Sequence, residues 1–69
     1  VNSSIVGKEI VNLDGKTASL IDYDATAEIF DTNGIKVADL TPASPEFSAD
    51  FPGIFIIRSG ANTQKVVLQ

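Results

Sequence analysis

The sequence contains no cysteine, histidine, methionine or tryptophan. Without cysteine the chain can form neither disulfides nor thiolate metal sites, and without histidine it lacks the commonest transition-metal ligand and general base. Serine or cysteine nucleophiles that rely on a histidine are therefore excluded. We expect a protein that is not an enzyme and that has no catalytic, cofactor-binding or metal-binding residues.

Positive charge is also scarce. Five lysines and arginines stand against nine aspartates and glutamates, which gives a net charge of −4 and a pI near 4.3. An acidic surface repels the phosphates of nucleic acids and the head groups of anionic lipids. Nucleic acids and membrane surfaces are therefore not expected as partners.

Long hydrophobic runs are missing as well. The longest are a few residues, such as 54–57, whereas a membrane helix needs roughly 20, so direct membrane insertion is not expected. A chain of 69 residues forms at most one small domain, without a deep pocket. Because the chain begins at Val1 and has no methionine, we expect it to be excised from a longer protein.

The residues that are present favour β-structure. Isoleucine, valine and threonine account for 19 residues, and turn-forming residues interrupt the chain every 6–10 positions. This spacing predicts an all-β fold, a small antiparallel β-sandwich of about seven strands. The segments expected to be extended are 4–6, 9–13, 17–21, 26–31, 35–38, 46–49, 53–58 and 63–69.

Turn chemistry predicts how these segments connect. Glycine suits the hairpin turns expected at residues 7–8, 14–15 and 59–62, and Asn33-Gly34 supplies the positive φ angles of a tight hairpin. Two prolines within residues 41–45 remove backbone donors, which predicts a loop or a crossover between sheets.

The segment 53–58 is apolar at nearly every position, which predicts a central strand packed on both faces. With its neighbours it gives five candidate core residues. They are Ile29, Val37, Ile54, Ile56 and Val66.

Several fragments resemble functional motifs but are better explained by structure. Gly15-Lys16-Thr17 lacks the first glycine of a phosphate-binding loop, and Asn2-Ser3-Ser4 is a short glycosylation pattern that arises often by chance. Four aspartates could bind Ca²⁺, and Asp22 with Asp24 could provide paired carboxylates, but their spacing favours turn residues and solvated charges. They are Asp22, Asp24, Asp31 and Asp39.

Five aromatic residues could form a platform for sugars or bases, although a core of this size needs rings to fill it. We therefore favour core packing. The five are Tyr23, Phe30, Phe47, Phe51 and Phe55.

The last forty residues carry an ordered series of short motifs. Phe30-Asp31 is followed by Asn33-Gly34, then by Pro52-Gly53 with Phe55, and finally by 65–67, which read Lys-Val-Val. In order and spacing the series resembles the C-terminal sorting domain of the type IX secretion system. The first 26 residues carry no motif of this family.

The resemblance implies an immunoglobulin-like β-sandwich, here residues 1–69, that follows an upstream domain of an exported protein. It implies secretion through the periplasm of Bacteroidetes-type bacteria, release or display at the cell surface, and the outer-membrane export machinery as partner. Addition of a strand at a sheet edge would supply recognition with little demand on side chains. The residues expected to be recognised are Asn33, Gly34, Lys65, Val66, Val67, Leu68 and Gln69.

A different interpretation remains open. An immunoglobulin-like module can also act as a passive spacer in a surface protein, or bind glycans through exposed aromatic residues and acidic loops. The sequence alone does not separate this class of protein from a sorting domain.

Overall fold

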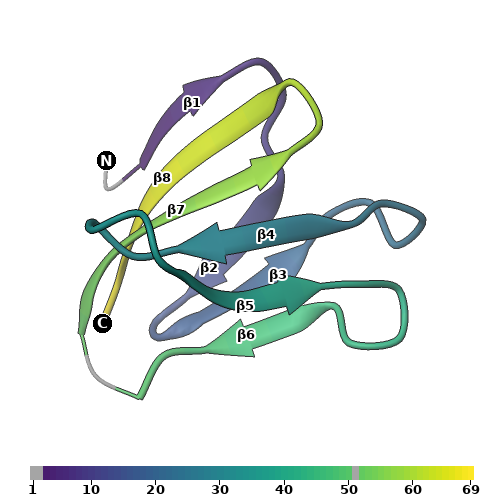
Figure 1. The fold of residues 1–69 in the computed structure, drawn as a ribbon. Helices are drawn as coiled ribbons and strands as arrows, with labels where there is room; N and C mark the ends of the chain where they lie inside the picture. The colour runs from purple at the N-terminus through teal and green to yellow at the C-terminus, as the bar shows by residue number, and fades with distance from the viewer. Residues whose placement is uncertain (1–2, 51) are drawn as a thin grey trace.

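The computed structural model describes residues 3–50 and 52–69. Within these residues the chain forms eight β-strands and no helix (Figure 1). The predicted all-β class is confirmed, with eight strands that match the eight segments expected to be extended. The strands are β1 (Ser3–Val6), β2 (Val11–Asp14), β3 (Thr17–Leu20), β4 (Ala27–Phe30), β5 (Lys36–Leu40), β6 (Glu46–Ser48), β7 (Gly53–Ser59) and β8 (Asn62–Leu68).

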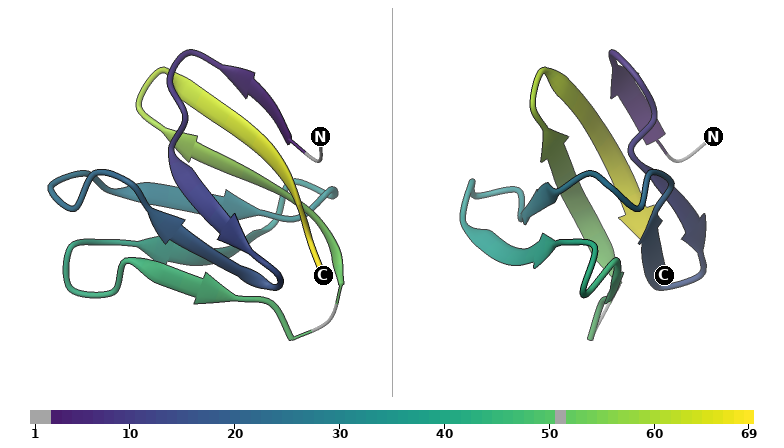
Figure 2. Two further views of the ribbon diagram at one scale, coloured as in Figure 1. Left: turned by 180° about the vertical axis from the view of Figure 1, so that it is seen from behind. Right: turned by 90° about the vertical axis from the view of Figure 1, so that its right-hand side faces the viewer.

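The strands form two antiparallel sheets that face each other (Figure 2). The larger sheet has the order β1-β8-β7-β4-β5, and the smaller has the order β2-β3-β6. The core lies between them, and its fully buried large side chains come from both sheets. They are Val11 of the smaller sheet and Ile29, Leu40, Ile57, Gln64, Val66 and Leu68 of the larger one.

The predicted hairpins β2–β3 and β7–β8 are confirmed. In each, two residues form the turn, with Gly15 and Gly60 at φ 59°. The turn at Asn33-Gly34 is also confirmed as a β4–β5 hairpin, but it spans more residues than a tight turn. Only Gly34 has a positive φ there (82°), and the Asp31 carboxylate accepts hydrogen bonds from the backbone N–H groups of Asn33 (2.9 Å) and Ile35 (3.0 Å).

The predicted hairpin at residues 7–8 is wrong, because β1 and β2 belong to different sheets. β1 instead pairs with β8, with Ser4 opposite Lys65. Gly7 (φ 85°) lies so close to the Asn62 side chain that a Cβ would overlap with it, and the Lys8 N–H donates to Asn62 Oδ1 (3.0 Å). These contacts direct the chain out of the larger sheet and into the smaller one.

Residues 41–45 form the predicted crossover, from β5 in the larger sheet to β6 in the smaller one. Thr41 and Ser44 close this loop with reciprocal backbone hydrogen bonds of 3.0 and 3.1 Å. Among the described strands β6 pairs with β3 alone and is therefore an edge strand.

Of the five candidate core residues, Ile29 and Val66 are fully buried. Val37 and Ile54 are wrong predictions, with 45% and 41% of their surface exposed, and Ile56 is only half-buried. β7 is central within its sheet, but only the face bearing Phe55 and Ile57 meets the other sheet. Val37 lies at a register shift opposite β4, where the in-out alternation is interrupted.

Candidate functional site

The face of the larger sheet that points away from the smaller one is the best candidate for a recognition surface. On β7 and β8 the inward positions are filled by Phe55, Ile57, Val66 and Leu68, so the alternate residues point outward. We call this surface the outer face, and Figure 1 views it from the front. It comprises Glu28, Phe30, Lys36, Asp39, Ile54, Ile56, Arg58, Thr63, Lys65 and Val67.

The outer face contains a hollow of about 320 Å³. Phe30 and Ile56 are cross-strand partners at its floor, and Lys65 lies opposite Ile56 on the next strand. Gly34, Arg58 and Thr63 complete the lining, and the Arg58 Cζ lies 5.0 Å from the centroid of the Phe30 ring. The hollow thus combines an apolar floor with a cation stacked on an aromatic ring.

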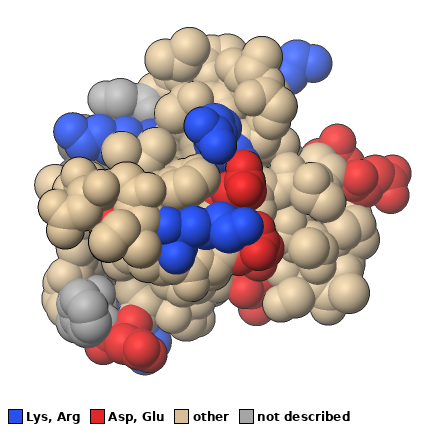
Figure 3. All heavy atoms as spheres, in the orientation of Figure 1, with Lys and Arg blue, Asp and Glu red and all other residues tan. Residues whose placement is uncertain are grey.

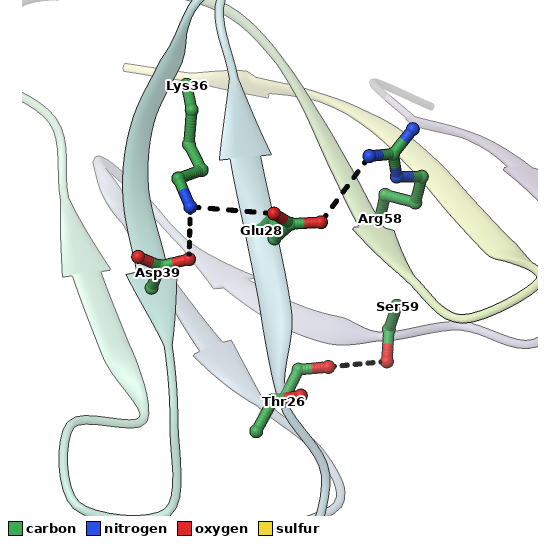
Figure 4. Close-up of polar contacts among 6 residues, drawn as sticks. All are labelled: Thr26, Glu28, Lys36, Asp39, Arg58 and Ser59. Atoms are coloured by element: carbon green, nitrogen blue, oxygen red, sulfur yellow. Dashed lines mark hydrogen bonds and ion pairs between the residues drawn. The ribbon is translucent and has the colours of Figure 1, made fainter.

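A chain of ion pairs crosses the same face (Figure 4). The Glu28 carboxylate lies between the Arg58 guanidinium (3.4 Å) and the Lys36 ammonium (3.5 Å), and Lys36 also pairs with Asp39 (3.1 Å). The hydrogen bond and the charge of Asp39, followed by Glu28, raise the pKa of Lys36 above its ordinary value. All four side chains are about half-exposed, so each pair contributes little stability.

Charge is distributed unevenly over the molecule. The outer face carries three of the five cations and two of the nine carboxylates, a balance of +1. The remaining two cations and seven carboxylates leave −5 for the rest of the chain. Figure 3 shows basic side chains near the centre of this face with carboxylates directly beside them, and further carboxylates towards its edges. The outer face is therefore the part of the protein best suited to an acidic partner.

The residues expected to be recognised do not share one surface. Lys65 and Val67 lie on the outer face, whereas Val66 and Leu68 are fully buried and pack in the core. Gln69 is exposed, and its N–H donates to the Gly15 carbonyl (3.1 Å).

The β4–β5 turn brings a second part of this set to the same face. Gly34 lines the hollow, and the neighbouring Asn33 is exposed. The closing strand is not a sheet edge as strand addition would require, because β8 lies between β1 and β7. The contributions of Ile56, Arg58 and Thr63 were missed, since the sequence does not show which strands become neighbours.

Asp22 and Asp31 stabilise turns, as predicted, whereas Asp39 lies within β5 and pairs with Lys36. Asp22 Oδ1 accepts the backbone N–H of Asp24 (2.9 Å), and Asp31 holds the β4–β5 turn. Over residues 3–50 and 52–69, no three acidic side chains are grouped as a metal site would require. The glycosylation pattern begins at Asn2, which lies outside the described residues.

The aromatic residues divide between core and surface. Phe47 and Phe55 pack edge to face, with ring centroids 5.7 Å apart, and Phe55 belongs to the core. Tyr23 is 68% exposed, which contradicts core packing for this ring, and Phe51 lies outside the described residues. Among the described aromatic residues, Phe30 alone lines the hollow.

Comparison of the chain with protein-family models, with curated proteins and with solved structures found no match. In the part of the chain that the structure describes, no helix is long and apolar enough to cross a membrane.

Proposed function

We propose that this chain is a non-catalytic sorting domain, an immunoglobulin-like module recognised by the outer-membrane type IX export machinery. It would direct an upstream protein domain through the periplasm to the cell surface or the medium of a Bacteroidetes-type bacterium. One observation carries the proposal: motifs from distant parts of the resemblance meet on the outer face. Phe30 and Gly34 line the hollow there, and Lys65 lies directly opposite Ile56 of its floor.

In this proposal the closing strand has two roles. Its outward residues Lys65 and Val67 contact the receptor, while Val66 and Leu68 hold the sandwich together from the core side. The receptor recognises a folded surface, because the outer face exists only when β4, β7 and β8 are paired. Such recognition requires neither a cofactor nor a reactive side chain.

Export can be measured directly. Residues 1–69 are fused to the end of a periplasm-directed fluorescent protein in a host with a working type IX system and in a host that lacks it. We expect fluorescence at the surface or in the medium only in the first host. Retention in the periplasm of both hosts, with the domain shown to be folded, contradicts the proposal.

Point variants separate recognition from folding better than a deletion does. Removing residues 63–69 would delete an internal strand and unfold the larger sheet. Lys65→Glu changes only an exposed side chain of the outer face, and Lys16→Glu makes the same charge change at the exposed β2–β3 turn. We expect export to fall severalfold for Lys65→Glu and to stay unchanged for Lys16→Glu.

One observation favours the alternative, a spacer or a glycan-binding adhesion module. Tyr23 is 68% exposed and stands between two acidic residues, Asp22 and Asp24, as in a ring that stacks on sugars. If the fusion is folded but not exported, a glycan-binding screen with the Tyr23→Ser variant as control tests this second class.

A further inference from the structure

Residues 21–24, in the turn between β3 and β4, expose an aromatic ring flanked by two acidic side chains, and we call this segment the projection. Tyr23 is 68% exposed and Ile21 is 42% exposed, with Asp22 and Asp24 on either side of the tyrosine. The turn has a defined shape, because Asp22 Oδ1 accepts the Asp24 N–H (2.9 Å) and the Asp22 carbonyl accepts the Ala25 N–H (3.1 Å). Within the described residues the Asp24 carboxylate has no ion-pair partner.

The hollow of the outer face has complementary chemistry. Its floor of Phe30 and Ile56 is apolar, and Arg58 stands at its rim. The Arg58 guanidinium uses one nitrogen for Glu28 at 3.4 Å and keeps further N–H donors for another carboxylate. Lys65, beside the floor, has no ion pair among the described residues.

The projection and the hollow of one molecule do not meet. Phe30 is the last residue of β4, whereas the turn bearing Tyr23 precedes the first residue of that strand. The turn projects from one end of the sandwich (Figure 1), and none of its residues lines the hollow. A contact between these two features must therefore join two copies of the chain.

We propose that the hollow of one copy receives Tyr23 from a second copy, with Asp24 pairing with Arg58 or Lys65. This inference goes beyond the proposed function and does not depend on it. The contact joins different surfaces of the two copies, so it can continue from copy to copy as an open chain. The opposite charges of the outer face and of the remaining surface favour this arrangement over a face-to-face dimer.

The contact is expected to be weak. The whole chain exposes 4342 Å², and a contact that covers roughly a tenth of each copy buries well under the roughly 1,200 Å² of standard interfaces. Dissociation constants of about 0.1–1 mM are therefore expected. Sedimentation velocity from about 0.05 to 1 mM protein should show the average mass rising with concentration. Raising ionic strength from about 0.02 to 0.3 M should weaken association about threefold or more.

Two variants test the two surfaces separately. Tyr23→Ser removes the projecting ring and Arg58→Glu reverses the charge at the rim, and each should weaken association by about tenfold or more. If circular dichroism shows that Arg58→Glu is not folded, Lys65→Glu replaces it. Lys16→Glu is the matched control and should associate as the unmodified chain does.

Mixing the variants gives the decisive result. A Tyr23→Ser copy retains an intact hollow and an Arg58→Glu copy retains an intact projection. An equimolar mixture should therefore form a 1:1 heterodimer although each variant alone is monomeric. A chain that stays monomeric to about 1 mM at low salt, or variants that associate as strongly as the unmodified chain, overturns the proposal. Neither result bears on export, which is measured with the fluorescent fusion.

Discussion

The side-chain amide of Gln64 pairs with the backbone of Val11 as a neighbouring strand would. Gln64 Oε1 accepts the N–H of Val11 (3.0 Å), and Gln64 Nε2 donates to the Val11 carbonyl (3.4 Å). The same oxygen also accepts the Ile10 N–H at 2.8 Å. Gln64 is 1% exposed, so a buried residue of β8 in the larger sheet binds the first residue of β2 in the smaller sheet.

The hydrogen bonds of Gln64 protect the edge of β2 and connect the two sheets. β2 is an edge strand, and unpaired edge groups invite association with other chains. The Gln64 amide occupies these groups at Val11 and also links the two sheets across the core. Because every hydrogen-bonding atom of the amide has a protein partner, its burial is not penalised.

Replacement of Gln64 by leucine should destabilise the protein although the core becomes more apolar. The N–H groups of Ile10 and Val11 would lose their acceptor in a buried place, which costs about 1–3 kcal/mol for each group. Urea unfolding should show a loss of at least about 2 kcal/mol. Gln69→Leu, at an exposed position, is the control and should change stability by less than about 0.5 kcal/mol.

Alanine substitutions along β7 should separate its two faces. Ile57 is fully buried, so Ile57→Ala should cost about 2–5 kcal/mol, whereas Ile54→Ala, at a position 41% exposed, should cost less than about 1 kcal/mol. The half-buried Ile56 should fall between them. Equal losses at Ile54 and Ile57 in urea unfolding would show that something covers the outer face.

The β7 residues also show how far the sequence can be interpreted. Strand positions and turns are local properties, and glycines 15, 34 and 60 marked three hairpins correctly. Strand partners are not local, so the pairing of β1 with β8 was not predicted. Residues 54–57 do not alternate between apolar and polar side chains. Their sequence therefore does not indicate that only one face of β7 is covered by the other sheet. The candidate site depends on which strands are neighbours and on which face of β7 is covered, so the sequence predicts only the motifs of the site.

Gly7 and Gly15 provide a matched test of the crossover between sheets. Both have positive φ, at 85° and 59°, so the left-handed backbone of an alanine at either position should by itself lower the free energy of unfolding by about 1–2 kcal/mol. A Cβ at Gly15 would meet open space, whereas a Cβ at Gly7 would overlap with Asn62 Oδ1, which also accepts the Lys8 N–H. Gly7→Ala should therefore have a clearly lower urea midpoint than Gly15→Ala. Equal midpoints would contradict the close approach of Asn62.

The ion pairs of the outer face predict a loss of stability at alkaline pH. Asp39, and then Glu28, raise the pKa of Lys36 in the folded protein above its value in the unfolded chain. The resulting stabilisation is fully present below the unfolded-chain pKa of about 10.4, and it disappears as the pH rises through the higher folded pKa.

We therefore expect the urea midpoint of the unmodified protein to fall from about pH 10 upward, and to fall less for Lys36→Gln. Lys16→Gln removes a lysine that forms no ion pair among the described residues, so it should follow the unmodified protein. Because Lys36 is well exposed, the difference should shrink when salt screens the pairs. Identical alkaline profiles for Lys36→Gln and the unmodified protein at low salt would show that the pairs with Asp39 and Glu28 do not stabilise the folded state.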